Sequence, residues 1–406
     1  MASYLQRCGA VWQIEPLTAT LPDHAAVIPL YDENDSIYEV LHSIKRALNH
    51  SPEPVAVILV INEPLNAPAE SIQNNRELLQ SLRANDGKFD GGLAVGRELF
   101  FIDLTDRELP DKHRTVGNAR KSGFDSFLAQ SDGKVTDKKR LLFSLDADTL
   151  VSENYFESTF AWFAQHPGSG GAVIPFEHRT EGFSAEQKNA VLRYEYYLWD
   201  YALKLRNCGS RYGYWCIGSA FFCNAADYAA CGGMRRNAAG EDFYFLQALN
   251  KVAPLGIVPD CRVYPAGRIS HRVPFGTGPA VARQLAGEEQ KLYHDGIFAV
   301  LKEFFTAVNQ SSFDILSQEI TPLAPAELQE FFLTVDFAGV WAKIVRNSPR
   351  NAEALRQNLH NFCDGFFILK FAHFLEEKYP LRFPRMPLPA DDELPSGVQE
   401  LRSQFI

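Results

Sequence analysis

The hydrophobic and polar positions of this chain alternate in blocks that predict strands separated by helices. Between the strands, residues 37–49, 71–84, 115–129 and 153–165 repeat apolar positions with the period of a helix, and Ser36 stands where an N-cap is expected. Strands that alternate with helices form parallel sheets with right-handed crossovers, so we expect an α/β fold with a mostly parallel sheet flanked by helices. The predicted strands are short apolar runs over residues 25–30, 55–61, 99–104, 141–145 and 171–176.

The pattern changes in the second half of the chain. Residues 185–207 are typical of an aromatic-rich helix, residues 243–251 of a short helix and residues 258–263 of a further strand. Long helical patterns then dominate over residues 279–309 and 325–378. We therefore expect one α/β domain over residues 1–276 and a helical accessory region over residues 277–406.

The composition of the chain argues against several classes of protein. The chain has 40 Lys and Arg against 50 Asp and Glu, and its net charge of −10 argues against a nucleic-acid partner. Its seven cysteines form no C-x-x-C pair, which indicates reduced thiols and no zinc knuckle. No apolar segment reaches the roughly 18 residues of a transmembrane helix, and the first residues lack a signal-peptide pattern. We expect a soluble cytoplasmic protein.

Two aspartates at the end of a predicted strand are the strongest chemical signal. Asp146 and Asp148 follow the apolar run 141–145. In an extended segment, side chains two residues apart point to the same side, about 7 Å from each other. Two such carboxylates suit a hard divalent cation that carries a diphosphate. Ordinary carboxylates in a turn remain the alternative.

A second acidic pair opens the predicted helix 243–251. Glu241 and Asp242 follow Gly240, where the helix dipole alone would favour carboxylates. Downstream, Arg268, His271 and Arg272 adjoin a loop rich in glycine and proline, in which arginine side chains have the geometry to bind phosphate. A histidine in such a place is also an ordinary loop residue.

Six motifs occur in a fixed order along the chain. They are Val-Ile-Pro-Leu-Tyr-Asp-Glu-Asn at 27–34, a strand ending in Asn62, Gly-Asn-Ala-Arg-Lys-Ser-Gly at 117–123, Asp-Ala-Asp at 146–148, Gly-Ser at 218–219 and Glu-Asp at 241–242. In this order the chain resembles the family 2 glycosyltransferases, which have the Rossmann-like GT-A fold, over about residues 23–278. It departs from the family at Asp32, where asparagine is usual, and at Asn62, where an acidic residue is usual.

The resemblance implies an inverting transfer of a sugar from a nucleoside-diphosphate sugar, of UDP or GDP type, to the hydroxyl of a glycan, a lipid or another acceptor. It implies Asp242 as general base, with Glu241 positioning a sugar. Mg²⁺ or Mn²⁺ would be held by Asp146, Asp148 and His271. The nucleotide would contact Pro29, Tyr31, Glu33, Asn62, Gly117, Arg120 and Asp146, and the sugars would contact Trp215, Gly218, Ser219 and Arg272.

Two other hypotheses remain open. The string Leu-Asp-Ala-Asp-Thr at 145–149 also resembles the nucleophile motif of haloacid-dehalogenase-type phosphatases, in which the first aspartate attacks phosphorus and the second acts as acid and base. That motif normally opens its fold, whereas several strands and helices are expected before it here. The replacements at Asp32 and Asn62 also fit a protein that binds a nucleotide sugar without turning it over.

Overall fold

The computed structural model describes residues 1–406 apart from residues 10, 18–19, 85–91, 132–135, 237–239 and 270–275. Two compact units make up the chain. The first contains Met1–Val191, Cys216–Arg283 and Phe405–Ile406, and the second contains Leu192–Trp215 and Gln284–Gln404. Helix α6 (Ala185–Asn207) begins in the first unit and continues into the second. The functional division into a domain over 1–276 and an accessory region over 277–406 stays a prediction.

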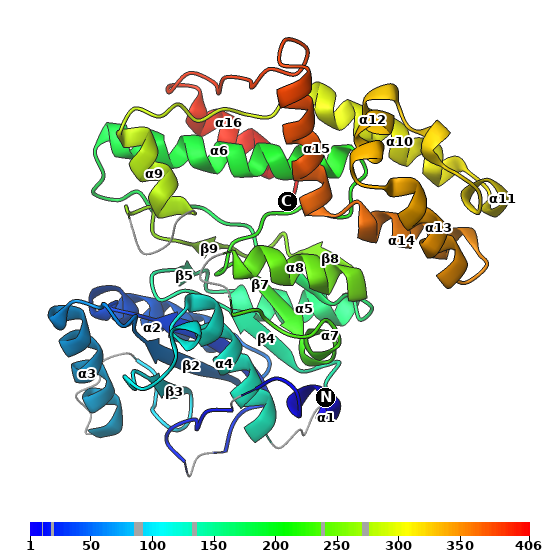
Figure 1. Ribbon diagram of the computed structural model, residues 1–406. Coiled ribbons are helices and arrows are strands. Elements are labelled where there is room, and N and C mark those ends of the chain that lie inside the picture. Colours follow the sequence, from blue (N-terminus) through cyan, green and yellow to red (C-terminus); the bar gives the residue numbers. More distant parts are fainter. Residues whose placement is uncertain (10, 18–19, 85–91, 132–135, 237–239, 270–275) are drawn as a thin grey trace. The chain divides into compact units, whose positions relative to one another are not determined.

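A seven-stranded sheet forms the centre of the first unit (Figure 1). All of its strands run in one direction except β7, which is antiparallel to both of its neighbours. The expected α/β class, a mostly parallel sheet flanked by helices with helices in the C-terminal part, is confirmed. The strands lie in the order β3 (Leu99–Leu104), β2 (Val55–Asn62), β1 (His24–Leu30), β4 (Leu141–Ser144), β7 (Phe221–Asn224), β6 (Gly171–Val173) and β8 (Leu255–Ile257).

The central strands are the ones whose apolar runs were most continuous in the sequence. Every residue of β1 and β2 is buried, and the two strands pair from His24 with Val55 to Leu30 with Ile61. Strands covered on both faces need such uninterrupted apolar runs, which explains why their positions could be predicted. The predicted strand over 258–263 is wrong, because β8 ends at Ile257 and the next short strand, β9, covers only Val263–Tyr264. Strand β9 pairs with β5 (Leu150–Val151) in a separate two-stranded sheet.

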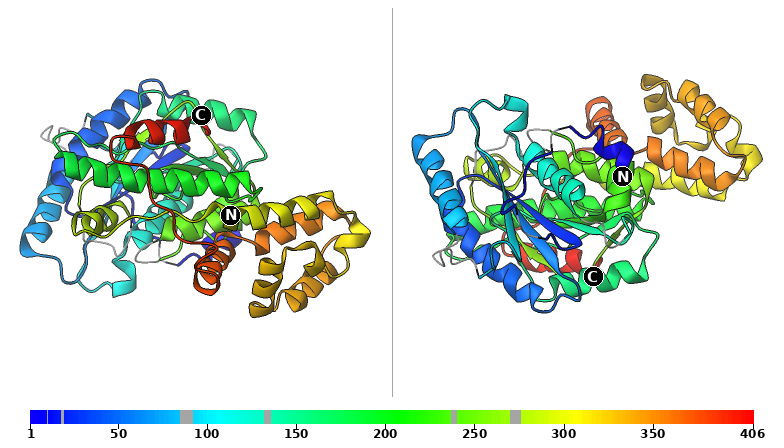
Figure 2. Two further views of the ribbon diagram at one scale, coloured as in Figure 1. Left: turned by 90° about the horizontal axis from the view of Figure 1, so that it is seen from above. Right: turned by 90° about the horizontal axis from the view of Figure 1, so that it is seen from below.

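Helices cover both faces of the main sheet (Figures 1 and 2). Helix α4 (Val116–Gln130) packs on β1 and β2 so closely that a Cβ at Gly123 would lie 2.3 Å from a methyl carbon of Val27. Helix α2 (Asn34–Leu48), on the other side, buries the predicted stripe that contains Val40 and Ile44. Its N-cap is Glu33 and not Ser36, whose hydroxyl instead donates to the Glu33 carboxylate at 2.7 Å.

The first unit contains further helices besides α2 and α4. Helix α8 begins at Glu241, so the Glu-Asp pair occupies its first two positions. Besides α8 (Glu241–Val252), the unit contains α1 (Ala2–Leu5), α3 (Ala69–Ala84), the 3₁₀ helix Asp111–His113, α5 (Tyr155–Gln165), α7 (Ala225–Ala230) and most of α9 (Thr277–Leu285).

In the second unit, the described residues form helices and no strand. The predicted long helical stretches are each divided, since residues 279–309 contain α9 and α10 and residues 325–378 contain four helices. None of the described helices combines the length and the apolar composition that a membrane span requires. The helices are α10 (Asp295–Gln310), α11 (Phe313–Leu316), the 3₁₀ helix Thr321–Leu323, α12 (Ala326–Thr334), α13 (Phe337–Asn347), α14 (Ala352–Phe362), α15 (Gly365–Lys378) and α16 (Leu394–Ser403).

Candidate functional site

The carboxyl ends of β1, β2 and β4 place acidic and amide side chains along one edge of the sheet. These three strands are parallel and adjacent, so the residues that follow them emerge at the same edge. Glu33 follows β1, Asn62 ends β2 and Asp146 follows β4. Ligands of open α/β sheets bind at such an edge, so this edge is the candidate site.

The Asp-Ala-Asp segment at residues 146–148, here called the aspartate triplet, lies in a turn and not in an extended strand. Strand β4 ends at Ser144, and the Thr149 amide donates to the Asp146 carbonyl at 3.1 Å, which closes the turn over residues 146–149. The expected extended geometry of Asp146 and Asp148 is thus wrong. Their carboxylates instead pair with two different arginines, Arg120 and Arg268.

Arg120 joins the aspartate triplet to the Glu-Asp pair. Its side chain is 2% exposed, and its guanidinium donates to Asp146 Oδ1 at 2.7 Å and to Glu241 Oε1 at 3.2 Å. It also donates to Ser144 Oγ at 2.7 Å and to the carbonyls of Leu145 and Gly218. One buried side chain from α4 therefore holds together two acidic motifs that are 95 residues apart in the sequence, Asp146 and Glu241.

The close approach of Arg120 explains the glycine at position 218. A Cβ at Gly218 would lie 2.6 Å from the Arg120 guanidinium and 3.6 Å from Asp146 Oδ2. The Gly218 carbonyl also accepts from Ser144 Oγ at 2.6 Å. Beside it, Ser219 is 1% exposed, and its hydroxyl has no hydrogen-bond partner among the described residues. Both residues of the predicted Gly-Ser segment thus lie next to the acidic cluster. This cluster consists of Asp146, Asp148, Glu241 and Asp242 with the arginines Arg120 and Arg268.

Asp242 has an environment suited to proton transfer. Burial, together with the charge of Glu241, raises the pKa of Asp242 to about 7, although Arg120 and the Phe243 amide oppose this rise. The Phe243 amide donates to Asp242 Oδ1 at 2.7 Å. Helix α8 begins after Gly240, which has φ 69°, a conformation that glycine adopts without strain. A carboxyl group that titrates near neutrality is a suitable general base.

Arg268 forms a second bridge between carboxylates. It pairs with Glu33 and with Asp148 Oδ2, the latter at 3.1 Å. Burial and the nearby charge of Asp146 raise the pKa of Asp148 to about 6, while Arg268 lowers it. From the sequence, Arg268 was predicted only as a phosphate ligand. Its partners are 120 and 235 positions away, so no local signal could have identified the two ion pairs.

Helix α3 secures the two loops on the nucleotide side of the predicted site. Asp32 has φ 54°, and asparagine and aspartate adopt this left-handed conformation more readily than most residues, which explains how either fits at this position. Its carboxylate accepts from Ser71 and Asn74 at 2.7 and 2.8 Å. Asn75 accepts from the Asp32 amide at 3.1 Å and donates to the Asn62 carbonyl and the Glu63 carboxylate, both at 3.3 Å. Asn75 was not among the residues predicted for the site.

The other predicted nucleotide contacts lie around the same edge. Pro29 is in β1 and buried, Tyr31 is half-buried directly after β1, and Gly117 is buried in the first turn of α4. Asn62 is 5% exposed, and its side chain donates to the Arg114 carbonyl at 3.3 Å. The contacts of these residues with a nucleotide stay a prediction.

The acidic cluster fits a divalent cation only in part. In the described part of the chain, no group of three or more His, Cys, Asp or Glu side chains is arranged as a complete metal site. Asp146 and Asp148 are close enough for the charge of Asp146 to raise the pKa of Asp148. Magnesium is typically bound by one or two carboxylates, with substrate phosphates and water as its other ligands, so this pair fits such a cation.

Three predicted residues are not placed at this site. His271 and Arg272 lie outside the described residues. Trp215 belongs to the second unit, where its ring is 2% exposed and lies 4.3 Å from that of Trp199. Trp215 is therefore packed in the core of that unit. Its contact with a sugar stays a prediction.

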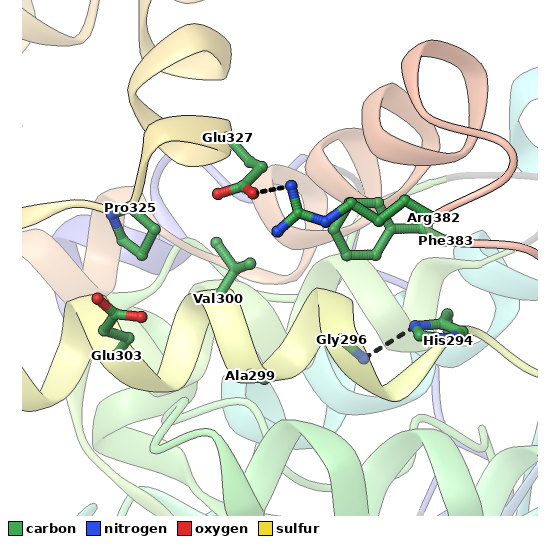
Figure 3. A pocket seen from close by; sticks show the side chains of 9 residues that line it. All are labelled: His294, Gly296, Ala299, Val300, Glu303, Pro325, Glu327, Arg382 and Phe383. Atoms are coloured by element: carbon green, nitrogen blue, oxygen red, sulfur yellow. Dashed lines mark hydrogen bonds and ion pairs between the residues drawn. The ribbon is translucent and has the colours of Figure 1, made fainter.

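Each unit has a hollow in its described surface, and neither hollow is lined by Arg120, Asp146, Asp148, Glu241 or Asp242. One of about 270 Å³, in the first unit, borders α3 and is lined by residues that include Glu63, Arg76 and Arg107. One of about 380 Å³ lies within the second unit (Figure 3). In this hollow Arg382 points toward Glu327 and forms an ion pair with it. The residues that line it are His294, Gly296, Ala299, Val300, Glu303, Pro325, Glu327, Arg382 and Phe383.

No protein-family model matches the sequence, and no curated protein matches it. Among solved structures, residues 1–349 of S. aureus TarS, in complex with UDP-GlcNAc, are similar over 84% of this chain and 90% of that chain, with 12% identity and a TM-score of 0.38. The mannosyltransferase PcManGT from Pyrobaculum calidifontis, in complex with GDP-Man and Mn²⁺, is similar over 100% of this chain and 90% of that chain, with 15% identity and a TM-score of 0.36. Similarities this weak assign no function to the chain.

Proposed function

We propose that this protein is an inverting glycosyltransferase of the GT-A type, resembling family 2, that moves a sugar from a nucleoside-diphosphate sugar to an acceptor hydroxyl. One observation carries the proposal. Arg120 holds the aspartate triplet and the Glu-Asp pair together at the carboxyl edge of the sheet, beside a carboxyl group that titrates near neutral pH. In this proposal the arrangement brings a base and charged side chains for a phosphorylated donor to one place.

In the proposed mechanism, Asp242 takes the proton of the acceptor hydroxyl while the oxygen attacks the anomeric carbon from the side opposite the nucleoside diphosphate. Positioned proton transfer of this kind contributes typically about 10²- to 10⁴-fold to a rate. Glu241 acts through Arg120, to which it is ion-paired at 3.2 Å, and keeps that guanidinium turned toward Asp146. A UDP or GDP donor would lie along Pro29, Tyr31, Glu33, Asn62 and Gly117, with its sugar near Gly218 and Ser219.

Asp146 and Asp148 would hold Mg²⁺ or Mn²⁺, and His271 is proposed as a further ligand. When bound, such a cation stabilises the charge that develops on a leaving diphosphate. Arg272 is proposed to contact the donor from the same segment. The acceptor of the sugar is a hydroxyl group of a glycan, a lipid or another compound.

The first test is the thermal stability of the purified protein with nucleoside diphosphates and nucleotide sugars, each with and without Mg²⁺ and Mn²⁺. A ligand at about 100 times its dissociation constant adds about 2.7 kcal/mol, which raises the unfolding midpoint by a few degrees. We expect one nucleotide to act only with metal, and Asp148→Ala to abolish that shift. Asp260→Ala, at an exposed position of the same unit, is the matched control and should keep it. No shift with any nucleotide would contradict the proposal.

The second test separates binding from catalysis. Asp242→Asn should keep the metal-dependent thermal shift and lower the transfer rate by about 10²- to 10⁴-fold, because only the base is lost. Full transfer activity in this variant would show that Asp242 is not the base. A phosphoaspartate at Asp146 after incubation with a phosphate ester would favour the phosphatase hypothesis. Nucleotide-sugar binding without turnover in the unaltered protein would favour a binding protein.

A further inference from the structure

Arg268 forms ion pairs with two carboxylates of the candidate site, those of Glu33 and Asp148. Its guanidinium forms an ion pair with Glu33 and lies 3.1 Å from Asp148 Oδ2, with Nε at 3.3 Å from the same oxygen. Glu33 comes from the end of β1 and Asp148 from the turn after β4. Arg268 therefore bridges the same sheet edge at which the proposed cation would bind.

The two arginines of the cluster differ in how firmly they are held. Arg120 is 2% exposed and donates to two side-chain carboxylates, a hydroxyl and two carbonyls. The side chain of Arg268 is 39% exposed, and the residue follows β9 on a segment without helix or strand structure. Moving Arg268 away from Asp148 thus requires less rearrangement than moving Arg120.

Arg268 and a divalent cation cannot both be accommodated at Asp148 without repulsion. Magnesium binds a carboxylate oxygen at about 2.0 to 2.1 Å, which would place it within a few ångströms of a guanidinium that is 3.1 Å from the same oxygen. Two positive groups at this separation repel strongly in a partly buried site. The positive charge of Arg268 must therefore weaken the binding of a cation by Asp148.

We propose that Arg268 takes the place of the divalent cation at Asp148 in the ligand-free protein and has to leave that carboxylate before a cation can bind. This inference rests on the proposed metal-assisted function. The diphosphate of the donor offers the displaced guanidinium a new anionic partner, since arginine pairs readily with phosphate. Cation and diphosphate would then strengthen each other's binding, and the protein alone would bind the cation weakly.

The test is Mn²⁺ binding followed by electron paramagnetic resonance at about pH 8, where carboxylates are ionised. We expect Arg268→Gln to bind Mn²⁺ alone roughly tenfold more tightly than the unaltered protein, because a competing charge is removed. We also expect the nucleoside diphosphate identified by thermal stability to tighten Mn²⁺ binding less in this variant, since the coupling between the two ligands is reciprocal. Arg262→Gln removes an arginine that pairs with Glu177 at 3.4 Å in the same unit, and it should leave Mn²⁺ binding unchanged.

Unchanged or weaker Mn²⁺ binding in folded Arg268→Gln would overturn the inference. If that variant does not fold, Arg268→Lys decides, because its single ammonium group does not span both carboxylates and a rise of roughly threefold is expected. No rise with lysine also overturns the inference. If no form binds Mn²⁺, with or without nucleotide, the metal-assisted function and the inference fail together. If Arg268→Gln tightens Mn²⁺ binding but no sugar is ever transferred, only the proposed function fails.

Discussion

At the scale of single residues, the candidate site contains carboxyl groups that are costly to ionise. Burial raises the pKa of Asp242 and of Asp148 above that of an exposed aspartate, to about 7 and about 6. In each case a neighbouring carboxylate, Glu241 or Asp146, adds to the rise. Such groups cost stability when they ionise, and groups of this kind are more common at functional sites than elsewhere.

The raised pKa of Asp242 predicts a dependence of stability on pH. An aspartate in an unfolded chain has a pKa of about 4, so between about pH 4 and pH 7 the folded state binds more protons at this position. The contribution of Asp242 to stability is therefore present below this window and is lost as the pH rises through it. Asparagine is neutral throughout, and Asp242→Asn should unfold at a higher temperature than the unaltered protein at about pH 8.

The difference in unfolding temperature should shrink as the pH falls and disappear near about pH 4, where the aspartate is protonated in both states. Scanning calorimetry across this range measures it. The exposed Asp260→Asn serves as the control and should differ little from the unaltered protein at any pH. A constant difference at all pH values for Asp242→Asn would show that packing, and not ionisation, is responsible.

At the scale of elements, α4 and α3 hold the residues of the candidate site in different ways. Helix α4 is buried along most of its length, from Gly117 to Leu128, and thereby carries Arg120 into the centre of the unit. Helix α3 instead uses the polar side chains of Ser71, Asn74 and Asn75 to hold the loops after β1 and β2. Packing thus orients the side that we propose to be catalytic, and hydrogen bonds orient the side that we propose to bind the nucleotide.

Replacing Arg120 should destabilise the first unit strongly. Arg120→Gln leaves Asp146 and Glu241 without their shared guanidinium, and removing one partner of a buried ion pair costs about 3 to 5 kcal/mol. Arg46→Gln is the control, because its pair with Glu153 is exposed and such pairs contribute about 0 to 1 kcal/mol. Urea unfolding measures both variants. Equal losses would show that Arg120 does not link the two acidic motifs energetically.

Asn75 should affect binding of the donor more than the rate of transfer. The residue is fully buried, and Asn75→Ala removes its hydrogen bonds to Asp32, Asn62 and Glu63, at a cost of about 1 to 3 kcal/mol. We expect a higher KM for the donor and a kcat within about threefold of the original, since the reacting groups are untouched. The exposed Gln73→Ala on the same helix should change neither constant. A fall in kcat alone would contradict this assignment.

At the scale of the whole molecule, the two units have separate means of stabilisation. In the second unit a buried ion pair between Glu195 of α6 and Arg402 of α16 joins the C-terminal helix to α6. The Trp199 indole also donates to Glu195 at 3.4 Å. An apolar core that contains Phe304, Phe332 and Phe371 also stabilises this unit.

Because the chain has two compact units, we expect two unfolding transitions in calorimetry, each of which responds to a different change. Arg402→Gln should lower the unfolding transition of the helical unit, because it leaves Glu195 buried without its charge partner at a cost of about 3 to 5 kcal/mol. The nucleotide with Mn²⁺ should raise the other transition, since its proposed site lies in the first unit. Lys291→Gln is the control, as its pair with Glu289 is exposed. A single transition that responds to both changes would show that the units unfold as one.

Much of the fold could be predicted from the sequence because it depends on local patterns. Continuous apolar runs identified β1, β2, β3 and β4 to within one residue at each end, and the apolar stripe of α2 was found with them. The short strands β8 and β9 were missed as separate strands, since two or three residues carry too little pattern to identify a strand. Four of the residues predicted for the site, Asp146, Asp148, Glu241 and Asp242, could be chosen because acidic residues at the ends of strands and starts of helices stand out locally.

From the sequence alone, Asp146 and Asp148 could be assigned to the end of a strand at the carboxyl edge of a mostly parallel sheet, because strands that alternate with helices run parallel and end at one edge. How the acidic charges are balanced followed only from the folded structure. Arg120 pairs with Asp146 and Glu241, and Arg268 pairs with Glu33 and Asp148, across as many as 235 positions of the chain. Ion pairs depend on distance in space and not in sequence, so the partner of each carboxylate, and with it each raised pKa, became visible only after folding.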